Sequence, residues 1–195
     1  LGGGHLERLA TLTIGDGRIE RLPPQPVAAA LEHFRALHRA ITDGLVLACH
    51  DCAEGGLAVA LAEMAIAGRR GVTVDALANL PAPAGLAEPA LLFSESLSRF
   101  VVEVAAEDAA AFESLLAAAD VPHGRIGVTT GDTAFQIYTD GGDLLLNHDV
   151  VTLEAAWRGE GGIGDRGFGI GEGPAQEAKV RAPISNLQSP VSISN

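Results

Sequence analysis

The feature that most constrains this chain is a short apolar run that passes into two glycines and an alanine-rich stretch. The run 45–49 is followed by His50-Asp51, and Gly55-Gly56 precede the apolar stretch 57–67. A short run without polar alternation predicts a strand covered on both faces. A stretch that is apolar nearly all round predicts a helix over 55–67, buried between layers. A strand–turn–helix junction with acids and exposed backbone N–H groups is the kind of place that can hold a metal-bound phosphate.

The rest of the chain alternates between helical and strand patterns. Apolar residues at helical spacing, acidic first turns and glycine stops predict three further helices, over 27–41, 107–119 and 152–157. Strand composition predicts strands over 71–75, 99–104, 125–129, 133–139 and 144–146, and a hairpin around 9–21. Short turns between some strands and helices between others predict an α+β fold, a mixed sheet layered by helices.

The apolar face predicted for the first helix is built from residues three, four or seven positions apart. They are Val27, Leu31, Phe34, Leu37, His38 and Ile41. Pro81, Pro83 and Pro89 predict a loop that leads into Leu91-Leu92-Phe93-Ser94-Glu95-Ser96.

Composition excludes several classes of protein. Of the 195 residues, 47% are hydrophobic and only 4% aromatic, so the interior should be filled by aliphatic side chains. The formal charge of −12, with thirteen scattered Lys and Arg, argues against nucleic acid as a partner. No apolar run reaches the roughly 20 residues of a membrane span, and the first residues lack the pattern of a secretion signal, so we expect a cytoplasmic protein.

The two cysteines form a single C-x-x-C pair. Cys49 and Cys52 could be a redox pair or half of a zinc site. No second cysteine pair is present to complete a structural zinc set. The favoured interpretation is therefore two small buried thiols, with no metal site.

The twin-glycine junction supports two interpretations at each position. Gly55 and Gly56 allow the backbone to approach a phosphate, but a tight turn or close strand–helix packing also needs them. Asp51 and Glu54 repel a bare phosphate, so a phosphate role needs a cation between them, and N-capping of the helix is favoured. We expect His50 to be a rim histidine with a structural role rather than a base.

A second group of polar residues follows the proline-rich loop. Glu95, between Ser94 and Ser96, either caps a turn or accepts a hydrogen bond from a substrate or nucleotide hydroxyl. Arg99, at the start of a strand, either forms a surface salt bridge, with Glu95 for example, or meets a phosphate. We predict that this group and the twin-glycine corner meet at one edge of the sheet.

These motifs closely resemble the C-terminal domain of phosphoribosylformylglycinamidine synthase. In that family the first motif usually reads His-Asp-x-Ser-Asp-Gly-Gly-Leu and the second Phe-Ser-Glu-Ser-x-Gly-Arg-Phe. Here Ala53, Glu54 and Ser98 depart from the pattern, and the opening segment is similar to the family's Leu-Gly-Gly-Ser with Gly4 in place of Ser. The resemblance spans roughly residues 1–158.

The resemblance implies a fold like the C-terminal domain of aminoimidazole ribonucleotide synthetase, and a division of the chain into three parts. Residues 1–22 would leave a preceding ATP-binding domain, 23–158 would form the synthetase C-terminal domain, and 159–195 would be a Gly/Ser/Pro-rich tail or linker.

The resemblance also implies an activity in de novo purine biosynthesis. ATP, with Mg²⁺, phosphorylates the amide oxygen of formylglycinamide ribonucleotide, and ammonia from glutamine displaces the phosphate. Catalytic residues are not expected on this chain, and the fragment alone should be inactive. The implied partners are the preceding domains, a glutamine amidotransferase subunit or domain, and in some forms a second copy.

Within this resemblance, eight residues are candidates for a nucleotide or phosphate pocket. They are Asp51, Glu54, Gly55, Gly56, Ser94, Glu95, Ser96 and Arg99. Two alternatives remain open: a structural or docking module whose apolar faces complete an oligomer or interdomain core, and part of a sister ATP-dependent synthetase or kinase.

Overall fold

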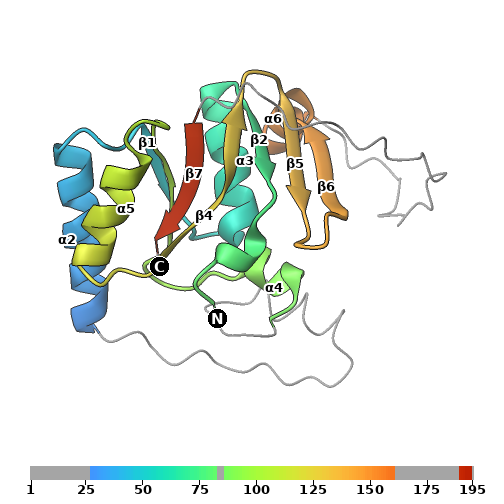
Figure 1. The fold of residues 1–195 in the computed structure, drawn as a ribbon. Helices are drawn as coiled ribbons and strands as arrows, with labels where there is room; N and C mark the ends of the chain where they lie inside the picture. Colours follow the sequence, from blue (N-terminus) through green and yellow to red (C-terminus); the bar gives the residue numbers. More distant parts are fainter. Residues whose placement is uncertain (1–26, 83–85, 161–188, 195) are drawn as a thin grey trace.

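The structure is a seven-stranded mixed sheet with helices on both faces (Figure 1). This computed structural model describes residues 27–82, 86–160 and 189–194. The strand order is β1-β3-β7-β4-β2-β5-β6, and every neighbouring pair is antiparallel except β2 and β5. The predicted α+β class, with a mixed sheet layered by helices, is confirmed.

Most predicted elements form near their predicted positions. The strands are β1 (Ala48–Asp51), β2 (Gly71–Val74), β3 (Phe100–Glu103), β4 (His123–Thr130), β5 (Ala134–Tyr138), β6 (Leu144–Asp149) and β7 (Ser189–Ser194). The helices are α2 (Val27–Thr42), α3 (Gly56–Gly68), α4 (Glu88–Phe93), α5 (Ala109–Ala118) and α6 (Val150–Trp157), with a 3₁₀ turn η1 (Leu77–Asn79).

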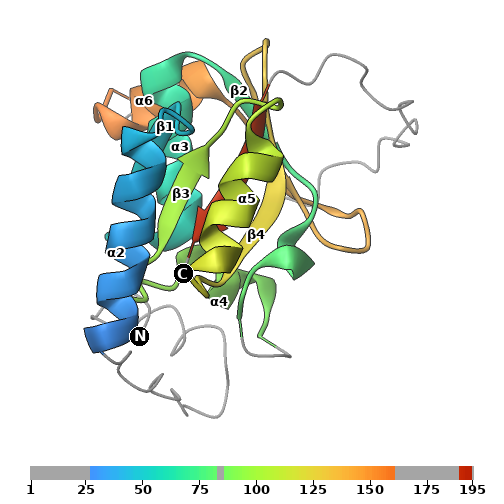
Figure 2. The same ribbon diagram turned by 60° about the vertical axis from the view of Figure 1, so that its left-hand side comes forward.

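The sheet separates two hydrophobic cores, one under each layer of helices (Figure 2). Strand β3 shows the alternation, because Val101 packs into the core with α3, α4 and α6 whereas Val102 packs into the core with α2 and α5. Both valines are fully buried. The central strands are therefore covered on both faces, and β1 is an edge strand of the described sheet.

Helix α3 is buried as predicted, because it is apolar nearly all round. It lies against the sheet, and α4 and α6 pack beside it on the same face. Leu57 and Leu61 are almost completely buried, as are the small residues Ala58, Ala60 and Ala65. Small side chains let neighbouring backbones approach closely, which matters at the first turn of this helix.

The first strand differs from its prediction. The apolar run 45–49 was expected to be a strand covered on both faces, but β1 begins at Ala48 and lies at an edge of the sheet. Its residues alternate between half-buried and exposed. Leu45 and Val46 pack against the α2–α5 core before the strand begins, and Leu47 is 59% exposed. The apolar run thus serves as a packed connection more than as a central strand.

The buried face of α2 is also different from the one predicted. Leu37 is buried together with Ala36 and Ala40, but Leu31 and Phe34 remain 45% and 47% exposed. Ile41, in line with them along the helix, is 50% exposed. The helix therefore carries a second apolar stripe, Leu31–Phe34–Ile41, that the described residues cover only in part.

One buried polar group on α2 makes stability depend on pH. His33 is 6% exposed, and its Nδ1 finds no hydrogen-bond partner among the described residues. Burial lowers the pKa of His33 from its usual 6.5, so the folded state holds the imidazole neutral. Its contribution to stability is complete well above pH 6.5 and is lost as the pH falls through 6.5, because the unfolded chain then binds a proton that the buried ring takes up less readily.

We therefore expect the free energy of unfolding to fall between about pH 7.5 and about pH 6.0, by at most about 0.8 kcal/mol from this group. Urea unfolding at the two pH values measures the change. His33→Leu should remove this part of the pH dependence, whereas His38→Gln, on the exposed side of the same helix, should retain it. An unchanged pH dependence in His33→Leu would contradict the assignment.

Two elements, α4 and β7, form in segments where no helix or strand was predicted. Helix α4 forms where a loop was predicted, with Glu88 in its first turn and Pro89 at a position where proline is tolerated. Six residues of the segment expected as a tail form β7, between β3 and β4. The predicted hairpin at 9–21 and the segment 1–22 lie outside the described residues. No described helix is long and apolar enough to span a membrane.

Candidate functional site

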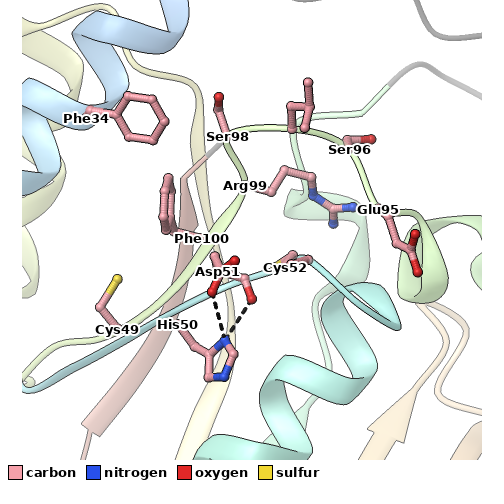
Figure 3. Close-up of a pocket in the computed structure, with 12 residues that line it drawn as sticks. Phe34, Cys49, His50, Asp51, Cys52, Glu95, Ser96, Ser98, Arg99 and Phe100 are labelled. Carbon is pink, nitrogen blue, oxygen red and sulfur yellow. Dashed lines mark hydrogen bonds and ion pairs between the residues drawn. The ribbon is translucent and has the colours of Figure 1, made fainter. Parts of the chain in front are cut away.

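A cavity of about 610 Å³ opens at the edge where β1 turns toward α3 (Figure 3). Strand β1 and the corner that follows it form one wall, the loop 95–99 forms the other, and Phe34 of α2 closes one end. The lining residues are Phe34, Cys49, His50, Asp51, Cys52, Ala53, Glu95, Ser96, Leu97, Ser98, Arg99 and Phe100.

The predicted meeting of the twin-glycine corner and the serine-flanked glutamate is observed. The backbone N–H of Gly55 donates to Oε1 of Glu95 at 3.0 Å, a half-buried contact between residues 40 positions apart. Four of the eight candidate residues line the cavity: Asp51, Glu95, Ser96 and Arg99. The other four do not line it. Glu54 is exposed to solvent, and Gly55, Gly56 and Ser94 belong to the backbone that supports the lining.

Both glycines are required by the backbone. Gly55 precedes α3 with φ +78°, and Gly56 begins the helix with φ +66°. A Cβ on Gly56 would lie 2.7 Å from the carbonyl oxygen of Ser94 and 2.8 Å from the carbonyl carbon of Phe93. The end of α4 therefore rests directly on the first turn of α3, and the close-packing interpretation accounts for Gly56.

The capping prediction for the two acids of the corner is wrong. The residue that precedes α3 is Gly55, which has no side chain to cap it, and within the described part of the chain neither Asp51 nor Glu54 accepts a hydrogen bond from the first turn. The carboxylate at this helix end is that of Glu95, brought there by the packing of α4 on α3. Asp51 instead lies 3.5 Å from Nδ1 of His50, with its side chain 61% exposed.

Arg99 is buried, which corrects the expectation of a surface salt bridge. Only 8% of it is exposed, and no carboxylate among the described residues lies within ion-pair distance. Its guanidinium donates to the hydroxyl of Ser94, to the carbonyl oxygen of Ser94 at 3.2 Å and to that of Leu91 at 3.4 Å. Burial lowers the pKa of Arg99 from its ordinary value, although the group remains a cation.

Glu95 and Arg99 thus complement two helix ends. The carboxylate lies at the amino end of α3, where the helix dipole favours a negative charge, and the guanidinium lies at the carboxyl end of α4, where it favours a positive one. Both charges come from one loop, so the loop 94–99 fastens α3 and α4 together beside the cavity.

His50 lies on the cavity lining, and its ring is held by contacts within the fold. Its Nε2 lies 3.1 Å from Oε2 of Glu63 on α3, and its Nδ1 lies 2.7 Å from the carbonyl oxygen of Asp51. These contacts tie the edge strand to the helix above it. Both ring nitrogens therefore lie against oxygen atoms of the chain, which fixes the orientation of the ring.

The two cysteines differ in exposure. Cys52 is buried, as expected, whereas Cys49 is exposed because it lies on the edge strand. Loss of hydration, and secondarily the charge of Asp51, raises the pKa of Cys49 to about 11. Burial raises the pKa of Cys52 to about 11 as well, although Arg99 acts in the opposite direction. Both thiols stay protonated near neutral pH, and within the described residues no three His, Cys, Asp or Glu side chains are grouped as metal ligands.

Four further lining residues were not predicted as candidates, and for one of them the sequence departs from the family motif. Phe34 and Phe100 meet edge to face with centroids 5.8 Å apart, and Leu97 is largely exposed. Ser98 has φ +64°, a conformation that favours glycine, at the position where the resembling family has Gly. The departure at Ser98 therefore marks a strained turn in the cavity wall.

We expect Ser98→Gly to raise the free energy of unfolding by about 1 kcal/mol, because relief of a strain of about 1–2 kcal/mol outweighs the added freedom of the unfolded chain. Ser96→Gly is the matched control, since Ser96 is in the same loop without a positive φ. It should lower stability. Urea midpoints measure both, and a loss of stability in Ser98→Gly would refute the strain argument.

The chain belongs to the family described as AIR synthase related protein, C-terminal domain, which matches residues 15–140. It is also similar to curated proteins named phosphoribosylformylglycinamidine synthase subunit PurL. The one from Deinococcus radiodurans is 39% identical over 70% of this chain, and the one from Zymomonas mobilis is 38% identical over 78%. The chain covers only 18% and 19% of those two proteins, about a fifth of their length.

Solved structures show the same fold. Thermotoga maritima PurL complexed with ATP superposes with a TM-score of 0.56 at 22% identity, over 63% of this chain and 21% of that one. The same protein complexed with FGAR gives 0.57 at 21% identity, over 64% and 20%. The expected resemblance, and the expected kind of fold, are therefore confirmed.

Proposed function

We propose that this chain is the C-terminal part of the synthetase subunit of phosphoribosylformylglycinamidine synthase. The whole enzyme would be an ATP-dependent ligase that converts formylglycinamide ribonucleotide and glutamine to the amidine in purine biosynthesis. The observation that carries the proposal is the family membership together with 36–39% identity to curated PurL subunits over about 70% of this chain. Its place would be the cytoplasm.

The cavity fits one wall of a nucleotide pocket rather than a whole one. Asp51 offers an exposed carboxylate, Ser96 a hydroxyl, and the aromatic pair Phe34–Phe100 an apolar surface. A Mg²⁺ ion prefers several oxygen ligands, and the described residues group no three acidic, His or Cys side chains. Asp51 would therefore act with ligands from the preceding domains, which fits residues 1–22 as the segment leaving those domains.

In this proposal the chain positions the nucleotide and shields it from water, and it supplies no reacting group. The nucleotide, when bound, supplies the phosphoryl group that activates the amide oxygen of the substrate. Asp51 holds a negative charge at the mouth of the cavity, and Phe34 and Phe100 exclude water from its end. Since no described residue is assigned to the chemistry, the fragment alone should be inactive.

Complementation tests the assignment. The full gene should restore growth of a purine auxotroph lacking this ligase and should not restore thiamine or selenium pathway mutants, which separates it from the sister kinases and synthetases. In the purified full subunit, Asp51→Asn should weaken binding of ATP with Mg²⁺ while the circular dichroism spectrum stays unchanged. Growth failure in all three mutants would count against the proposal.

A docking module is the second candidate, and the half-exposed stripe Leu31–Phe34–Ile41 favours it. The chain covers about a fifth of its relatives, so the proposed partners are the preceding domains, with a glutamine amidotransferase subunit and a second copy as further ones. Titration of ATP and Mg²⁺ into the purified chain separates the two roles. Saturable binding lost in Asp51→Asn indicates a site, and no binding indicates docking alone.

A further inference from the structure

The anion position at the amino end of α3 is already filled by a side chain of this chain. Oε1 of Glu95 accepts the hydrogen bond of the Gly55 N–H at 3.0 Å. The amino end of a helix carries partial positive charge and unpaired N–H groups, so it holds a carboxylate by the same interactions that hold a phosphate. Glu95 therefore takes the place that the glycine motif, as a sequence, offers to a ligand.

The second glycine of this corner is also engaged within the fold. The N–H of Gly56 donates to the carbonyl oxygen of Ala53 at 3.4 Å, and the end of α4 lies against Gly56 from the other side. The N–H of Gly55 is the donor that Glu95 occupies. Asp51 and Glu54 add two further carboxylates, which would repel a phosphate dianion.

The nearest guanidinium does not offset these charges. Arg99 lines the cavity, but its guanidinium donates to the carbonyl oxygens of Leu91 and Ser94 and to the Ser94 hydroxyl. Both charged side chains of the loop 94–99 thus make their hydrogen bonds within the fold. Glu95 bonds at the amino end of α3, and Arg99 bonds at the carboxyl end of α4.

We infer that Glu95 is a built-in carboxylate ligand of the α3 amino end, and that the twin-glycine corner does not bind a nucleotide phosphate while Glu95 is in place. Glu95 is then a positioning residue, which locks the loop 94–99 over the corner and sets the shape of the cavity. This inference concerns the folded corner alone, so it stands or falls independently of the proposed ligase activity.

Amide hydrogen exchange of Gly55, followed by NMR, tests the lock directly. The Gly55 amide should be protected in the wild-type chain and should exchange at least roughly tenfold faster in Glu95→Ala. Glu95→Gln keeps an acceptor oxygen without the charge and should be intermediate. Glu54→Ala removes a carboxylate in the same turn that makes no such bond and should leave Gly55 unchanged. Equal Gly55 exchange in wild type and Glu95→Ala overturns the inference.

Two anions test whether the corner is an occupied anion position. Acetate, a carboxylate like the lost side chain, should restore slow Gly55 exchange in Glu95→Ala and have no effect on wild type. Inorganic phosphate should produce no saturable shift of the Gly55 and Gly56 amides in wild type. Failure of acetate, or a saturable phosphate shift in wild type, refutes the inference. Should Glu95→Ala not fold, Glu95→Gln and the wild-type phosphate titration decide.

Discussion

Gly56→Ala should lower the free energy of unfolding by about 2–5 kcal/mol, enough to unfold a marginally stable domain. Two costs combine. An L-residue in the left-handed region at φ +66° costs about 1–2 kcal/mol, and overpacking a dense contact adds about 1–3 kcal/mol. The added Cβ would meet the carbonyl groups of Leu92, Phe93 and Ser94, all backbone atoms that cannot swing aside.

The same helix supplies the control. Gly68 is the last residue of α3 and has no positive φ, and a Cβ added there would meet no neighbouring atom within 4 Å. Gly68→Ala should therefore be neutral or mildly stabilising. Urea unfolding of both variants, followed by circular dichroism, measures the difference. A Gly56→Ala variant as stable as Gly68→Ala would mean that α4 does not rest on the first turn of α3.

The elements of the fold could be predicted because their signals are local. The stretch 57–67 is apolar on all sides and is the buried helix α3, and the amphipathic pattern of 107–119 is α5. The order of the strands could not be predicted in this way. Whether 45–49 is central or at an edge depends on which strands pair with it, and its partner strand β3 lies roughly 50 positions away along the chain.

The helix α2 shows how periodicity can identify a helix and still mislead about its buried face. Apolar residues recur at helical spacing at Val27, Leu31, Phe34, Leu37, His38 and Ile41. The face that packs into the core, however, is the one that carries Ala36, Leu37 and Ala40. Small alanines let α5 approach α2, whereas Phe34 and Ile41 stay exposed. The larger apolar stripe stays about half exposed among the described residues, and periodicity alone does not distinguish such a stripe from a core face.

The meeting of the candidate residues was predictable, but the bonds that each makes were not. The motifs around Gly55 and Glu95 both end at the same sheet edge, as expected. That Glu95 bonds to Gly55, and that Arg99 bonds to Ser94 and Leu91 rather than to Glu95, depends on the formation of α4. This helix lies in a proline-containing stretch that predicts a loop, so the pattern offered no reason to expect a helix end there for Arg99 to bond.

Arg99→Ala is expected to lower the free energy of unfolding by about 2–4 kcal/mol. Hydrogen bonds from a charged donor contribute about 1.5–3 kcal/mol each, and three acceptors on Ser94 and Leu91 lose their donor. The gain from no longer burying a guanidinium, which has no carboxylate partner among the described residues, offsets part of this loss. The net effect stays unfavourable because the two Ser94 acceptors are buried and the Leu91 carbonyl is partly buried, so water replaces the lost donor poorly.

Arg99→Lys distinguishes the fork of donors from the charge alone. An ammonium is a compact point charge and cannot bond two carbonyl oxygens and a hydroxyl in the geometry of a guanidinium, so the variant should fall between Arg99→Ala and wild type. Arg39→Ala, on the exposed side of α2 with a surface pair to Asp43, should change stability little. If Arg99→Ala had the same urea midpoint as wild type, the free-energy cost of burying the guanidinium would equal the stabilisation from its hydrogen bonds. The loop would then be fastened by Glu95 to α3, with no net stabilisation from Arg99 at the end of α4.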